Sequence, residues 1–217
     1  MAQSFEPTVV VDAYQGIRAR SCEILRSLDP GQAVLPVATC PQWSVTELSC
    51  HLFGVADDVL HGRLDNPGSE PWTAAQVDRH RSKPPAVIAE EWEASAEPFD
   101  AVLLVIPTPT NLQIVMDSVT HEYDLRLAVD QPGPSECLAL DIGADFLLRG
   151  LRSALPDLAA QIEGSELSGL ERLRALTGRR SARQLESLGI DGGLLGRYLS
   201  ASPMPMTPTD ILERSTS

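Results

Sequence analysis

The chain has no apolar run close to the ~20 residues that a membrane-spanning helix requires. Its first residues, Met1 to Pro7, contain neither the basic stretch nor the apolar core of an export signal. Hydrophobic residues make up 43% of the 217 residues, which is typical of a soluble globular protein. We therefore expect a cytoplasmic protein with no membrane partner, long enough for one large core or a core domain with an appendage.

Positive charge is also scarce, because 17 lysines and arginines face 30 acidic residues and the net charge is −13. This balance argues against nucleic acid as a partner and against docking on anionic lipid, since both require a cationic surface. The basic residues that exist gather in one C-terminal stretch as Arg172, Arg174, Arg179, Arg180 and Arg183. That stretch is either a solvated helix face or a pocket wall that binds an anionic small molecule through guanidinium groups.

Cysteine is represented by four residues without CxxC pairing or metal-finger spacing: Cys22, Cys40, Cys50 and Cys137. In a cytosolic protein these are expected to be reduced core residues. Cys50 precedes His51, but neighbouring side chains on a helix point about 100° apart. We therefore do not expect Cys50 to share a site with His51.

Convincing period-2 strand patterns are lacking, whereas apolar residues recur with helical spacing along most of the chain. The long helices are predicted at about 7–28, from Ser44 to before Asn66, and at about 86–105, 112–129 and 138–162. Shorter helices are predicted at about 167–176, 182–188 and 194–199, with a further option at 74–81. Pro98 and Pro156 are expected to kink or split their helices, and residues 32–42 are predicted as a loop.

This pattern predicts an all-α fold, a bundle of four main helices followed by small C-terminal helices. We assign residues 1–164 to the bundle, 165–201 to a short helical extension packed on it, and 202–217 to an extended or disordered tail rich in Pro, Thr and Ser. Bundles with a broad apolar face often dimerise, so a homodimer is an expectation by analogy alone.

Two histidine-bearing helical segments carry the chemistry. The first is Trp43-Ser-Val-Thr-Glu47-Leu-Ser-Cys-His51-Leu, and the second is Asp117-Ser-Val-Thr-His121-Glu-Tyr-Asp124. Asp117 and His121 are four residues apart and share one helix face, and His51 can join them if the two helices pack side by side. Two imidazoles and a carboxylate around an open position form the ligand set of a catalytic divalent-metal site, usually zinc.

Other residues near these segments have simpler interpretations. Glu47 lies one turn before His51 and is an alternative ligand, but Ser44 at the N-cap favours a capping-box role for it. His61 and His80 are more simply exposed structural histidines, although His61 could line the same cavity. The tryptophans are expected to anchor core and loops rather than to stack on a ligand.

The same two segments resemble the DinB-like superfamily and, more narrowly, the actinobacterial mycothiol-dependent maleylpyruvate isomerase family. The run Leu173-Arg-Ala-Leu-Thr-Gly-Arg-Arg-Ser181 is similar to a sequence common in the later part of such proteins. The resemblance implies a DinB-like four-helix bundle with an open divalent metal site at one end of its core. It implies His51, Asp117 and His121 as ligands, with Asp117 standing where the isomerase pattern has the longer Glu.

The resemblance further implies metal-dependent chemistry with a low-molecular-weight thiol such as mycothiol as cosubstrate. We expect thiol transfer to, or thiol-assisted cis–trans isomerisation of, a small electrophilic substrate that is anionic. Asp124 is expected to support the ligands, by accepting a hydrogen bond from an imidazole or by holding Arg126 or another base. Arg179 and Arg180 are the candidate catalytic cations by composition. A non-catalytic metal or ligand sensor and a metal-assisted hydrolase are the alternatives.

Overall fold

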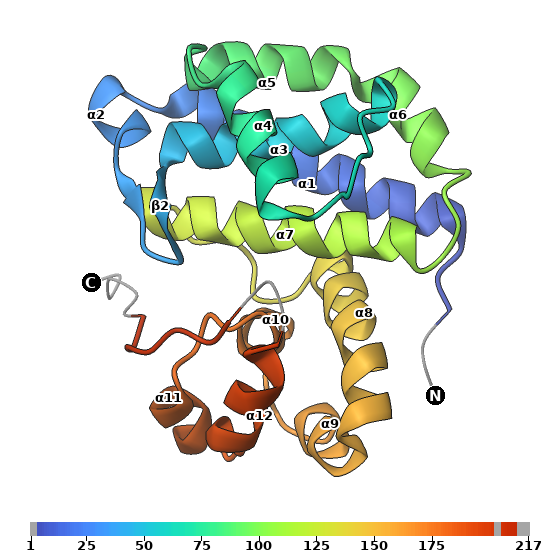
Figure 1. Ribbon diagram of the computed structural model, residues 1–217, viewed down its shortest axis with the longest axis vertical. Helices are drawn as coiled ribbons and strands as arrows, with labels where there is room; N and C mark the ends of the chain where they lie inside the picture. The colour runs from blue at the N-terminus through green and yellow to red at the C-terminus, as the bar shows by residue number, and fades with distance from the viewer. Residues whose placement is uncertain (1–3, 202–204, 212–217) are drawn as a thin grey trace.

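A computed structural model describes residues 4–201 and 205–211, and it consists mostly of helices (Figure 1). The predicted all-α fold class is confirmed, with one very small sheet as the only strand structure in the described residues. Among the helices of this part of the chain, none combines the length and apolar character needed to cross a bilayer.

The elements follow one another along the chain without a repeat. Their bounds are α1 Pro7–Ser27, α2 Pro30–Ala33, β1 Pro36–Val37, β2 Cys40–Ser44, α3 Val45–Leu60, α4 Glu70–His80, α5 Pro85–Ala94, α6 Ala96–Leu103, α7 Thr110–Val129, α8 Leu138–Ala154, α9 Pro156–Glu163, α10 Gly169–Leu176, α11 Ala182–Ser187 and α12 Gly192–Leu199.

A bundle of four helical members contains the main core. α1 packs against α5, α6 and α7, and α3 packs against the same three helices from the other side. α5 and α6 together form the fourth member, interrupted at Ser95. Pro98 explains this interruption, because it has no N–H to donate to the carbonyl of Ala94 one turn earlier. The split expected at this proline is therefore confirmed.

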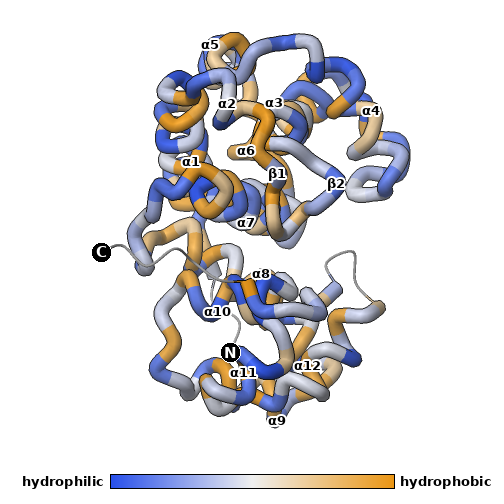
Figure 2. The backbone as a smooth tube through the Cα atoms, turned by 90° about the vertical axis from the view of Figure 1, so that its left-hand side faces the viewer, coloured by the Kyte–Doolittle hydropathy of each residue, from blue (hydrophilic) through white to orange (hydrophobic). Residues whose placement is uncertain are grey.

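A second lobe lies beside the bundle and is formed by the C-terminal half of α8 with α9 to α12 (Figures 1 and 2). The first half of α8, at Ala139, Leu140 and Ile142, belongs to the bundle core, whereas Leu148 and Leu151 belong to the core of the second lobe. The two hydrophobic cores therefore divide within α8. The sequence-based division at residue 164 stays a prediction.

The segment 205–211 runs over this second lobe. The backbone N–H of Thr207 donates to the carbonyl of Gly178 at 2.9 Å, and Ser181 Oγ donates to Asp210 at 2.5 Å. The predicted tail began at residue 202, and its residues 202–204 and 212–217 lie outside the described residues.

One local prediction was wrong. Residues 32–42 were expected to be a loop, but they contain the end of α2, all of β1 and the start of β2. β1 and β2 pair antiparallel, with Val37 opposite Cys40 and Pro36 opposite Ser44, and the register is irregular between Pro36 and Val37. A two-residue strand is too short to give a visible period-2 pattern, so the sequence held little signal for this hairpin.

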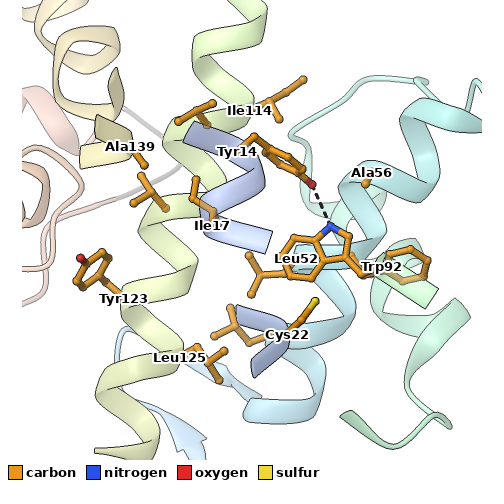
Figure 3. Packing of buried hydrophobic residues seen from close by; sticks show 14 of the residues in the cluster. Tyr14, Ile17, Cys22, Leu52, Ala56, Trp92, Ile114, Tyr123, Leu125 and Ala139 are labelled. Carbon is orange, nitrogen blue, oxygen red and sulfur yellow. Dashed lines mark hydrogen bonds between the residues drawn. The ribbon is translucent and has the colours of Figure 1, made fainter. Parts of the chain in front are cut away.

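Three aromatic rings fill the centre of the bundle core, and Figure 3 labels two of them, Tyr14 and Trp92. Tyr14 from α1 contacts Phe99 from α6 at 4.7 Å and Trp92 from α5 at 6.4 Å between ring centroids. All three side chains are fully buried. The indole N–H of Trp92 donates to the hydroxyl of Tyr14 at 3.1 Å, so the polar edge of the tryptophan has a partner inside the core.

We expect Tyr14→Phe to lower the free energy of unfolding by about 1–3 kcal/mol, because it leaves the buried indole N–H without an acceptor. Urea denaturation of both proteins measures this difference. Tyr198→Phe is the control, since Tyr198 lies half-buried in the second lobe away from this contact. Equal losses in the two variants would contradict a specific role for the Trp92–Tyr14 hydrogen bond.

Candidate metal centre

Local sequence fixes the start of α3 and so the position of His51. Ser44 Oγ accepts from the N–H of Glu47 at 3.3 Å, and Glu47 Oε2 accepts from the N–H of Ser44 at 2.9 Å. This is the predicted capping box, and it occupies the Glu47 carboxylate at the helix end. His51 lies on the next turn of α3 and is almost completely buried.

α7 supplies the other side of the site. Asp117, His121 and Asp124 follow one another at helical spacing along one stripe of this helix, which packs against α3. The imidazole rings of His51 and His121 lie 4.9 Å apart between centroids, at an interplanar angle of 87°. The indole of Trp43 from β2 covers both rings, at 5.2 Å from His51 and 5.9 Å from His121.

The structure brings the three predicted ligands together. His51 Nε2 lies 3.4 Å from Asp117 Oδ2, and His121 Nε2 lies 3.8 Å from Asp117 Oδ1. One ligand atom from each of the three residues falls within 4.8 Å of the other two. In a tetrahedral site with bonds of about 2.0–2.1 Å, neighbouring ligand atoms lie about 3.3–3.4 Å apart, so the 3.4 Å spacing matches such a site and the 3.8 Å spacing is somewhat wider.

The hydrogen bonds of the two imidazoles support the same conclusion. His51 Nδ1 lies 2.8 Å from Gln76 Oε1, and His121 Nδ1 lies 3.0 Å from Asp124 Oδ2. Both partners are acceptors, so each Nδ1 carries a proton, and in the neutral imidazole each Nε2 presents a lone pair. Two lone pairs and the Asp117 carboxylate then face one another without a donor between them. Such an arrangement favours a cation between the three groups, which is either a proton on His51 or a divalent metal ion.

The titration of the pair His51 and Asp117 follows from this geometry. Burial disfavours the charged form of His51, but the nearby Asp117 carboxylate, aided by Gln76, outweighs burial and raises the His51 pKa. Burial likewise opposes ionisation of Asp117, yet the His51 imidazole holds its pKa below the usual range. A proton on His51 is therefore the natural competitor of a metal ion at this site.

Asp124 links the site to the second lobe. Arg179, from the loop between α10 and α11, donates from Nη2 to Asp124 Oδ2 at 2.6 Å and from Nε to Oδ1 at 3.3 Å. Its Nη1 donates to the carbonyl of Thr177 at 2.8 Å. Burial alone would raise the pKa of Asp124, but Arg179 and His121 hold it well below its usual range. The Asp124 carboxylate, which orients His121, is thus held in place by Arg179 from the C-terminal part of the chain.

A second group of potential ligands, Cys40, His121 and Asp124, lies on the inner side of His121. A cation already occupies this side, because Arg179 Nη2 binds Asp124 and lies 3.9 Å from Cys40 Sγ. Burial and the charge of Asp124 raise the pKa of the Cys40 thiol to about 12, so the thiol stays protonated. We interpret this group as support for His121 rather than as a second metal site.

The remaining sequence-predicted residues are not placed as ligands. Arg179 and Arg180, the candidate catalytic cations, both bind carboxylates: Arg179 binds Asp124, and Arg180 donates to both oxygens of Glu171. His61 is exposed at the end of α3, as expected, but the expectation of an exposed His80 was wrong, because this residue is buried beside Asp57. The alternative partner considered for Asp124, Arg126, instead binds Glu122 at 3.0 Å.

Sequence reasoning missed the role of Gln76 and the position of Trp43. Gln76 lies in a polar segment that gave only a weak helical signal, and an amide has no place in a search for metal ligands. Trp43 was expected to be a simple anchor, yet its ring packs against both histidines. Its place eight residues before His51, directly before the capping box, was the available signal.

Comparison with known families gives an independent result. The sequence model of the family described as the mycothiol maleylpyruvate isomerase N-terminal domain matches residues 14–126, slightly more than half of the chain. The chain belongs to this family. The match extends from α1 to near the end of α7, so it contains all three predicted ligands. A search of curated proteins finds no match to the chain, and a search of solved structures finds none either.

Membership of the mycothiol maleylpyruvate isomerase N-terminal domain family bears on the predicted ligands, because the family is metal-binding. The resemblance drawn from the sequence implies glutamate at the position of Asp117, which is one methylene shorter. The shorter side chain still places its two oxygens 3.4 Å and 3.8 Å from the two imidazole Nε2 atoms. Reach is therefore no obstacle to Asp117 as a ligand. Arg179, which holds Asp124, comes from outside the matched residues.

Proposed function

We propose that the chain holds a divalent metal ion, with zinc the preferred occupant, at His51, Asp117 and His121. We further propose that it uses this ion in thiol transfer or thiol-assisted cis–trans isomerisation of a small electrophilic substrate, with a mycothiol-type thiol as cosubstrate. The family description supports the thiol, and the donor set of two imidazoles and one carboxylate supports zinc.

One observation carries the metal part of this proposal. The two Nε2 lone pairs and the Asp117 carboxylate converge without a hydrogen-bond donor, while each Nδ1 is tied to a fixed acceptor. Metal-binding histidines characteristically donate their other ring N–H in this way, which sets the tautomer and the ring orientation. Three protein ligands also leave a coordination position open, as catalytic sites do and structural sites do not.

A bound divalent ion would lower the pKa of a coordinated thiol, so that thiolate is available at neutral pH. The side chains around the site define where the thiol and substrate can enter. His51 is 5% exposed and His121 12%, whereas the Asp117 side chain is 32% exposed. Trp43 covers one side of both rings, and Asp124 with Arg179 closes the inner side. Ligands therefore approach from the Asp117 side.

Arg179 acts on the reaction indirectly in this proposal. Its guanidinium fixes Asp124, which in turn orients His121, so it is a positioning residue rather than the substrate contact that composition suggested. The catalytic assignment of Arg180 stays a prediction, and its binding to Glu171 argues against free access to a substrate. Charge stabilisation at the substrate must then come from other groups near Asp117.

The proposal is tested by metal content and thiol binding of the purified protein. We expect about one divalent metal ion per chain by elemental analysis. We also expect mycothiol to raise the melting temperature of the metal-loaded protein, because a ligand that binds only the folded state stabilises it. The metal-free protein should show little response to the same thiol. This comparison separates binding at the metal from binding elsewhere.

The other outcomes discriminate among functions. Metal binding without a thiol response would contradict thiol chemistry and favour a metal-assisted hydrolase or a sensor, because an open zinc site activates water equally well. Absence of metal binding across a panel of divalent ions would overturn the metal centre itself. Screening with electrophilic substrates in the presence of mycothiol then distinguishes transferase from isomerase activity.

A further inference from the structure

The orientation of one amide, that of Gln76, decides which nitrogen of His51 is free. The side chain is fully buried between α3 and α4, with Oε1 at 2.8 Å from His51 Nδ1. An amide has an acceptor end and a donor end of nearly equal shape. If the amide were reversed, His51 Nδ1 would have to accept, and its proton would move to Nε2, where it blocks metal binding. The site therefore needs a group that holds Gln76 in one orientation.

Asp58 is placed to do this. It lies on α3 two turns after His51, is completely buried, and accepts from Gln76 Nε2 at 2.9 Å. The guanidinium groups of Arg63 and Arg79 also donate to it, with Arg63 Nε at 2.6 Å. A carboxylate held by two guanidinium groups serves only as an acceptor. Gln76 must then direct its NH₂ group toward Asp58 and its oxygen toward His51.

We propose that Asp58 is a positioning residue that sets the tautomer of His51 through Gln76, a proposal that rests on the proposed metal function. Asp58 touches none of the three ligands, and it acts by fixing the donor end of the amide. The chain of contacts runs from Arg63 and Arg79 to Asp58, then to Gln76 and His51. It leaves the lone pair of His51 Nε2 directed at Asp117.

Gly54 provides a second and independent observation. It lies in the interior of α3, between His51 and Asp58, where glycine costs about 0.5–1 kcal/mol relative to alanine. A Cβ at this position would lie 2.6 Å from Gln76 Cβ and 2.9 Å from its Cγ. The glycine thus allows α4 to approach closely enough for Gln76 to reach both partners. Glycine at this position weakens α3 slightly but permits the close contact between α3 and Gln76.

The chain offers a matched pair of variants for the test. Asp57 and Asp58 are adjacent, and both bind Arg63 and Arg79. Asp57 also binds His80, but within the described residues it has no hydrogen bond to Gln76 or His51. Asp58→Asn and Asp57→Asn each remove one charge opposite the same arginines. Only the first introduces an NH₂ group that can donate to Gln76 and permit the amide to turn.

The experiment uses the full chain and two measurements. Ring ¹⁵N shifts of His51 in the metal-free protein, at a pH where the imidazole is neutral, report the tautomer directly. We expect Nδ1–H in wild type and in Asp57→Asn, and a shift toward Nε2–H in Asp58→Asn. Zinc affinity by chelator competition should fall about ten- to a hundredfold in Asp58→Asn relative to Asp57→Asn.

Gln76→Met keeps the size of the side chain and removes both ends of the amide, so it should reproduce the loss of zinc affinity and of the fixed tautomer. It also keeps the test decisive if Asp58→Asn fails to fold. The proposal would be overturned if Asp58→Asn or Gln76→Met, whichever folds, kept the Nδ1–H tautomer of His51 and bound zinc as tightly as Asp57→Asn does. Because the tautomer is measured in the metal-free protein, the failure of this proposal can be distinguished from a failure of the wild-type protein to bind metal.

Discussion

Replacing His51 or His121 by alanine is expected to abolish the stoichiometric binding of metal, reducing it from about one ion per chain to none. Each histidine supplies one of three ligand atoms, and the two that stay cannot compete with water or buffer for a divalent ion. Elemental analysis after dialysis, followed by titration with zinc under chelator competition, measures this loss. The two variants should both lose metal, because the nearby Asp124 carboxylate is already bound by Arg179 and the Cys40 thiol stays protonated.

Two other histidines provide the controls. His80 is buried, with its ring against Phe53 and its Nε2 at 3.2 Å from Asp57, so His80→Ala creates a cavity without touching the ligands. His61 is exposed, and His61→Ala removes an imidazole without a packing change. Both controls should keep the metal content of wild type. Full metal content in His51→Ala and His121→Ala would show that the ion is held elsewhere.

The sequence predicted that His51, Asp117 and His121 lie together because their signals are local. Asp117 and His121 lie four residues apart, which places them on one helix face wherever that helix packs. His51 follows a capping box that fixes the helix start, so its face was also determined by nearby residues. The remaining requirement was that α3 and α7 pack side by side, and helices of one bundle commonly do so.

The residues that hold the two histidines in place could not be predicted, because their roles depend on contacts between distant segments and not on a local sequence pattern. Gln76 is 25 residues from His51 in sequence, and Arg179 is 55 residues from Asp124. Nothing in the sequence around Gly54 indicates that a glycine is needed there, because the need arises only from the close packing of Gln76 on α4 against it. The arginine cluster illustrates the same limit. Composition suggested either a solvated face or a pocket wall, but Arg179 and Arg180 are buried against carboxylates.

Arg179→Met is expected to lower the free energy of unfolding by about 3–5 kcal/mol, because it leaves the buried Asp124 carboxylate without its cation. Asp124 is 3% exposed and would keep only the His121 N–H and the weak Cys40 thiol as donors. Urea denaturation of the metal-free proteins measures the change. Arg26→Met is the control, since the Arg26–Glu93 pair lies on the surface and its loss should change stability little.

The pH dependence of this difference tests its electrostatic origin. In wild type the pKa of Asp124 lies well below its usual range, because Arg179 and His121 outweigh the effect of burial. A depressed folded pKa contributes stability above the unfolded value of about 3.9, and that contribution is lost as pH falls below it. In Arg179→Met, burial raises the folded-state pKa of Asp124 with less opposition from neighbouring cations. Protonating Asp124 then removes an unpaired buried charge and recovers part of the lost stability of the variant. The stability gap should therefore be widest near neutral pH and should narrow once the pH falls below the folded-state pKa of Asp124 in the variant, which lies above that of wild type. A gap of constant size would assign the loss to packing instead.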